Sequence, residues 1–107
     1  MKINLSFVPP NGGETDYSLR MELPEIPRAG DYISIFRDGT SGTEDFIVKR
    51  TWWQLSYTDG EIAGSVKEIW VECEFAQGDC SSEAHKRACE SYQAKTGSLH
   101  IFDESMY

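Results

Sequence analysis

Cysteine, histidine and long apolar runs are all scarce in this sequence. The three cysteines, Cys73, Cys80 and Cys89, are odd in number and irregularly spaced, which argues against the disulfide framework of a small secreted domain. No stretch approaches the roughly 18 apolar residues that cross a bilayer. Residues 1–7 alternate between apolar and polar, whereas a signal peptide is continuously apolar. We therefore expect a cytoplasmic protein that does not enter membranes.

Motifs that carry chemistry are missing as well. Both histidines, His85 and His100, lie late in the chain, and there is no nucleophile elbow, phosphate-binding glycine loop or dinucleotide fingerprint. His85 and Cys89 share a face of an expected helix, but without a Cys-x-x-Cys pair the spacing argues against a zinc site. The sequence thus predicts a protein that is not an enzyme, with no catalytic residue, no metal and no cofactor.

Positive charge is also in short supply. Eighteen acidic and 10 basic residues give a formal net charge of −8. Nucleic-acid phosphates repel such a surface, so direct nucleic-acid binding is disfavoured. Two interpretations remain open: the charge keeps a small protein soluble, or it attracts a basic protein partner by complementary fields.

What the sequence does contain is a series of short alternating segments, in 107 residues that suffice for a single domain. Period-two alternation predicts strands over about 2–8, 16–23, 32–36, 46–57 and 62–75. A serine cap and a closing glycine predict a helix over about 82–95, followed by a short strand or tail over 98–107. We expect a mainly β fold with one C-terminal helix: a small five-stranded antiparallel SH3-like or OB-like barrel. The alternative is an open sheet with the helix across one face.

The connection after the second expected strand carries a resemblance. Its run Leu-Pro-Glu-Ile-Pro-Arg-Ala-Gly-Asp over residues 23–31, followed by Phe46-Ile47-Val48 and a tryptophan, resembles a pattern in small uncharacterised bacterial proteins. Turns of this kind recur in SH3-like barrels. The resemblance implies that fold type and says little about function.

The fifth expected strand, over about residues 62–75, offers a candidate partner-binding surface. Alternation places Ile69, Val71, Cys73 and Phe75 on the core face, and a second set on the opposite face: Glu68, Trp70, Glu72 and Glu74. A tryptophan among three carboxylates is a docking stripe for a cationic partner. The competing interpretation is that the helix covers Trp70 and that the glutamates pair with basic residues of the same chain.

A second candidate set lies in the preceding strand. Trp52 and Trp53 are adjacent, so they should point to opposite faces, with one in the core and the other exposed or covered by a loop. Together with Arg50, the exposed ring forms a candidate ligand-binding set (Arg50, Trp52, Trp53).

These observations favour a non-enzymatic protein–protein interaction module. Its size and acidity suit a small inhibitor or antagonist of a basic partner, of the kind that phages or mobile elements carry. One alternative is a barrel that binds a small ligand through Trp52 or Trp53. Another is a structural subunit of a homo-oligomer, such as a homodimer, in which exposed strand edges pair between copies.

Overall fold

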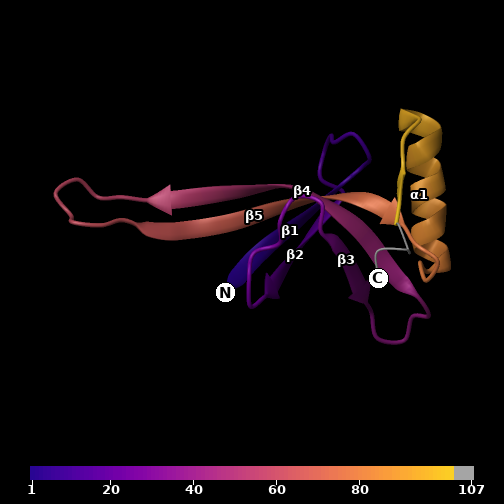
Figure 1. The fold of residues 1–107 in the computed structure, drawn as a ribbon, viewed down its shortest axis with the longest axis horizontal. Coiled ribbons are helices and arrows are strands. Elements are labelled where there is room, and N and C mark those ends of the chain that lie inside the picture. Colours follow the sequence, from indigo (N-terminus) through magenta and orange to yellow (C-terminus); the bar gives the residue numbers. More distant parts are fainter. Residues whose placement is uncertain (103–107) are drawn as a thin grey trace.

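A computed structural model of the chain describes residues 1–102 and shows one curled sheet with a single helix (Figure 1). Its elements, in chain order, are β1 (Lys2–Val8), β2 (Tyr17–Glu22), β3 (Tyr32–Phe36), β4 (Thr43–Ser56), β5 (Ser65–Gln77), α1 (Glu83–Thr96) and β6 (His100–Ile101). The bounds of β1 to β5 and α1 lie within a few residues of the expected ranges. The part of the expected tail after Phe102 lies outside the described residues.

The sheet has the strand order β2-β1-β5-β4-β3 and curls into a half-barrel, with β6 added beside β5. The expectation of a mainly β chain with one helix is confirmed. The expectation that all strands run antiparallel is wrong for two pairs, because β1 and β6 both lie parallel to β5. Sequence neighbours pair only about two-thirds of the time. Here the first strand carries buried side chains along its length, and it gains a strand on each edge by lying between β2 and β5.

The core lies on the concave side of the half-barrel. The predicted core face of β5 is buried as expected, with all four residues at most 6% exposed: Ile69, Val71, Cys73 and Phe75. These side chains pack against β1 and β4, where the rings of Phe7 and Phe46 lie with centroids 4.1 Å apart. Burial of these aromatic and branched side chains is the main force that holds the sheet in its curl.

Helix α1 covers one end of the sheet. The Ser82 side chain caps it by accepting a hydrogen bond from the backbone N–H of His85 at 3.2 Å, and Gly97, with a φ of 73°, ends it in the left-handed region. His85 and Cys89 are its buried residues. Among residues 1–102, no helix combines the length and the apolar character that a membrane crossing requires.

Strands β4 and β5 extend far beyond their neighbours. β3 pairs with β4 only as far as Ile47, and β1 pairs with β5 only from Trp70 onward. The remaining hairpin, residues 51–69, is a two-stranded ribbon that projects from the body at the end away from α1 (Figure 1). We call it the arm. It gives the molecule its elongated extents of 53 × 28 × 27 Å.

Candidate interaction surface

The face of the sheet opposite the core, here called the outer face, carries a row of side chains across four strands. Arg20 of β2 is the register partner of Asn4 in β1, Asn4 is that of Trp70 in β5, and Trp70 is that of Trp52 in β4. Register partners project to the same face, with Cβ atoms about 5 Å apart. The candidate residues Trp52 and Trp70, which the sequence assigned to different sites, therefore share one surface.

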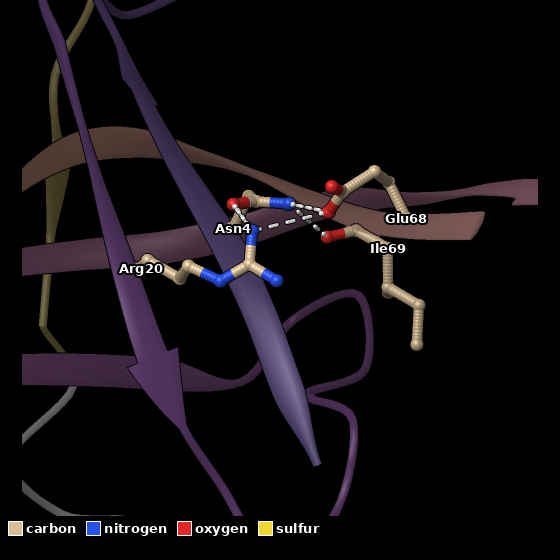
Figure 2. A network of polar contacts seen from close by, with 4 residues as sticks. All are labelled: Asn4, Arg20, Glu68 and Ile69. Atoms are coloured by element: carbon tan, nitrogen blue, oxygen red, sulfur yellow. Dashed lines mark hydrogen bonds and ion pairs between the residues drawn. The ribbon is translucent and has the colours of Figure 1, made fainter. Parts of the chain in front are cut away.

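Glu68 ties this row together at the base of the arm (Figure 2). Its carboxylate accepts a hydrogen bond from the Asn4 amide at 2.7 Å and faces the Arg20 guanidinium at 3.4 Å. The Asn4 amide also donates to the Ile69 carbonyl at 3.2 Å. The Asn4 hydrogen bond, with help from Arg20, holds the pKa of Glu68 below its ordinary value. Glu68 is thus a fixed anion that joins β1, β2 and β5.

The other two candidate carboxylates are also paired within the chain. Arg50 Nε lies 2.6 Å from Glu72 Oε2, and Lys49 Nζ lies 3.9 Å from Glu74 Oε2. The glutamate side chains are mostly covered, whereas the Arg50 side chain is 70% exposed. The competing interpretation held in part that the glutamates pair with basic residues of the same chain. That part agrees with the structure. Near Trp70, the outer face therefore presents to solvent the indole of Trp52 and the guanidinium groups of Arg20 and Arg50.

The two adjacent tryptophans do not behave as expected. They do point to opposite faces, since Trp53 is the register partner of the core residue Ile69, but neither enters the core: Trp52 is 60% exposed and Trp53 is 50% exposed. The physical reason is the length of the arm, which carries both residues past the strands that would cover them. Arg50, Trp52 and Trp53 therefore do not line a common cavity, because Trp53 lies on the face opposite the other two.

Sequence reasoning missed Asn4 and Arg20 as members of this surface. The alternation of β1 does place Asn4 on the polar face, which is a usable signal. No signal in the sequence pairs β1 with β5 across more than 60 residues, so the contact of Asn4 with Glu68 was not accessible. Trp52 was nominated, but its cross-strand partner depends on the bulge at Lys49, where the register shifts by one residue.

A second polar cluster is buried between β4 and α1. The Asp45 carboxylate, in a residue that is 2% exposed, accepts hydrogen bonds from Ser34 Oγ at 2.6 Å, from Thr43 Oγ1 at 2.9 Å and from Ser81 Oγ. His85 Nε2 lies 2.9 Å from the Asp45 carbonyl oxygen and 2.8 Å from that of Ala76. The imidazole thus contacts backbone, and neither serine hydroxyl reaches it as a nucleophile would reach its base.

The expected helix face of His85 and Cys89 does lie against the sheet. Cys89 Sγ lies 3.4 Å from the Ala76 carbonyl oxygen, which His85 also contacts. Cys73 is buried and Cys80 is exposed. Within residues 1–102, no three His, Cys, Asp or Glu side chains gather closely enough to hold a metal ion.

A third cluster of polar side chains connects β2, the end of β3 and β4. The Tyr17 hydroxyl donates to Glu44 Oε1 at 2.5 Å, and Arg37 pairs with the other carboxylate oxygen. Burial and the neighbouring carboxylate raise the pKa of Tyr17 above its ordinary value. Burial opposes the ionisation of Glu44, but the Tyr17 hydroxyl and the Arg37 guanidinium outweigh it and hold the pKa of Glu44 low. These groups satisfy one another and keep the edge strands in place.

Comparison with protein families, with curated proteins and with solved structures finds no significant match to this chain.

Proposed function

We propose that this chain is a non-enzymatic binding module that holds a protein partner on its outer face. The observation that supports this most directly is the tryptophan pair at the base of the projecting arm, in which Trp52 is exposed and Trp70 is half-buried. Tryptophan and arginine are the residues that most often dominate the binding energy of protein interfaces. Arg20 and Arg50, each with more than half of its side chain exposed, flank the pair and add polar contacts.

The partner that fits best is a basic protein. The glutamates of the outer face are neutralised locally, so attraction comes from the net charge of −8 rather than from a stripe of free carboxylates. A field of this kind speeds the encounter with a positively charged partner and suppresses acidic ones. The role that follows from this net charge is an inhibitor or antagonist of such a protein in the cytoplasm, like those that phages and mobile elements encode.

The relation of the half-barrel to SH3-like or OB-like barrels is part of the same proposal. It rests on the meander from β3 through β5 and on the proline-rich turn at 23–31, which matches the pattern of the small bacterial proteins that the chain resembles. Barrels of this type serve many functions, so the surface rather than the fold carries the functional proposal.

The test is to immobilise the purified protein and identify what it retains from an extract of its native host, with and without nuclease. We expect one dominant basic protein whose retention survives nuclease. Loss of the partner on nuclease treatment would mean that nucleic acid mediates the contact. A folded bait that retains nothing at moderate salt would refute the proposal.

Matched variants then locate the contact. Trp52→Ala should raise the dissociation constant of the partner at least roughly tenfold, as truncation of a central aromatic anchor does. Trp53→Ala is the control, because Trp53 is exposed to a similar degree on the opposite face. Equal effects of the two variants would show that binding does not depend on the outer face.

A further inference from the structure

We propose that the arm of one copy of this chain docks into the open core groove of a second copy, and that two such contacts form a symmetric dimer. The proposal goes beyond the function above, since it uses the inner face of the arm and a partner identical to the chain itself. It follows from two apolar surfaces that the fold leaves uncovered on the same molecule.

The first surface is the arm apart from Trp52, which lies on the outer face. Trp53 and Leu55 lie on its inner face, the face that continues the core side of the sheet, and Val66 is the register partner of Leu55. All three are at least 49% exposed, and so are Tyr57 and Ile62 nearer the turn. An isolated two-stranded hairpin is marginally stable in water. A ribbon of this length with so many exposed apolar side chains gains stability when something covers it.

The second surface is a groove of about 980 Å³ on the concave side of the half-barrel, between β2 and β3. Its floor is the core residue Leu5, and its walls include five half-buried members of the core: Met21, Leu23, Ile26, Ile33 and Ile35. Phe36 stands at its rim with 82% of its surface exposed. Both flanking strands lie at the ends of the strand order, and within residues 1–102 neither pairs with a further strand on its outer side.

The two surfaces are placed so that two copies can satisfy both at once. Pro27, which lines the groove, accepts a hydrogen bond from Thr51 Oγ1 at 3.3 Å, so the groove opens beside the base of the arm. The arm spans roughly 25 Å from Thr51 to its turn, at the usual rise of a strand. A copy related by a two-fold axis, with its arm antiparallel to this one, brings the tip of its arm to this groove.

The area involved is that of a stable dimer. An aromatic side chain has roughly 150–250 Å² to bury, so the exposed parts of the arm described above offer roughly 500 Å². Two arms in two grooves, with the matching surface of each groove, reach the range of roughly 1,200–2,000 Å² that specific interfaces bury. The contact is closed and isologous, so it yields dimers and not filaments.

One cation beside the groove offers the tip of a second copy's arm a charged contact, despite the net charge of each chain. Between Thr51 and Val66 the only charged residues are Asp59 and Glu61, both at the turn of the arm. Arg28 follows directly after the groove residue Pro27, is exposed, and has no ion-pair partner among the described residues. The tip carboxylates of one copy can therefore meet a cation beside the groove of the other, although Glu25 and Asp31 in the groove lining oppose the approach of these two acids.

The experiment is sedimentation or light scattering on the purified full chain alone, over a wide concentration range. We expect a dimer, and we expect both Leu55→Glu in the arm and Phe36→Glu in the groove to weaken it at least roughly tenfold. Both side chains are mostly exposed, so these variants should keep the wild-type circular dichroism. Ile101→Glu is the control, because Ile101 is exposed but lies in neither surface. A wild-type monomer at every concentration overturns the proposal.

Mixing the two variants separates arm-in-groove docking from other dimers. A Leu55→Glu chain keeps its groove and a Phe36→Glu chain keeps its arm, so an equimolar mixture can form one intact contact and should dimerise more tightly than either variant alone. A dimer that ignores Phe36→Glu, or variants that do not complement each other, would show that the copies associate elsewhere. Arg28→Glu should weaken the dimer, and Asp59→Arg with Glu61→Arg should restore it.

Discussion

Arg50 and Glu72 are register partners across β4 and β5, and Arg50 Nε lies 2.6 Å from Glu72 Oε2 beside the Trp52–Trp70 pair. Because the Arg50 side chain is 70% exposed, solvent screens this ion pair, and it contributes about 1 kcal/mol or less to stability. Its importance here is positional, because the pair fixes which charged groups stand next to the tryptophans.

Reversal of charge at Glu72 and Glu74 tests the electrostatic part of the proposed function. Glu72→Lys together with Glu74→Lys changes the net charge from −8 to −4 and sets lysines against Arg50 and Lys49. We expect slower association with a basic partner and a weaker dependence on salt, measured by surface plasmon resonance at several ionic strengths. Glu25→Lys with Asp38→Lys, at exposed positions outside the outer face, makes the same change in charge and is the control. Identical affinity in wild type and the first variant would remove this surface from consideration.

The cysteines should differ sharply in reactivity. Burial raises the pKa of both the Cys73 and the Cys89 thiol to about 12, whereas Cys80 is exposed. Since the thiolate is the reactive form, a thiol reagent at pH 8 should label one cysteine per folded chain and all three after denaturation. Mass spectrometry should place the native label on Cys80. Fast labelling of Cys89 in the native protein would mean that α1 opens from the sheet.

The same two thiols make stability depend on alkaline pH. Their folded pKa of about 12 exceeds the ordinary value of 9.0, so the unfolded chain loses these protons first as the pH rises. The stabilisation is complete below pH 9 and is lost progressively between pH 9 and 12. Urea unfolding at pH 8, 9 and 10 should show a falling free energy of unfolding. Cys89→Ala should flatten that decline, even though it lowers stability at pH 8, and a slope equal to wild type would contradict the assignment.

Asp45 should be the most sensitive buried polar residue of the fold. Three hydroxyls donate to its carboxylate, and an amide in its place would offer donors where acceptors are needed. We expect Asp45→Asn to lower the free energy of unfolding by about 1–3 kcal/mol. Asp38→Asn, in an exposed loop, should change it by less than about 0.5 kcal/mol. Equal effects in urea unfolding would show that the Asp45 cluster is not structural.

The sequence predicted local features well and long-range ones poorly. Alternation was enough to place Ile69, Val71, Cys73 and Phe75 in the core, because the two faces of a strand differ wherever one of them is buried. It could not show that β1 lies parallel to β5, since nothing local in either strand encodes that pairing. The expectation that either Trp52 or Trp53 enters the core was wrong for the same reason: whether a strand residue is covered depends on how far the neighbouring strands extend.

The candidate surface shows the same contrast between local features, which the sequence predicted, and long-range contacts, which it did not. Glu68, Trp70, Glu72 and Glu74 do share a face, as period two requires, but the cations that neutralise the carboxylates come from two other strands, β2 and β4. Trp52 joined them only through a cross-strand register that includes a bulge. A sequence pattern can assign a residue to one face of a strand, whereas its neighbours on that face depend on the pairing of the whole sheet.

Strand β5 pairs with β1, β4 and β6, so most of the sheet is assembled around a segment that is synthesised after β1 to β4. While the chain emerges from the ribosome, β1 and β2 can pair only with each other. The second edge of β1 stays unpaired until β5, more than 60 residues further along the chain, has been synthesised. Contacts of such long range slow folding and leave apolar strands uncovered in the meantime. A chain that stops before β5 lacks the strand that joins β1 to β4, so its two hairpins leave their apolar faces exposed, and we expect such truncated products to be bound by chaperones or degraded.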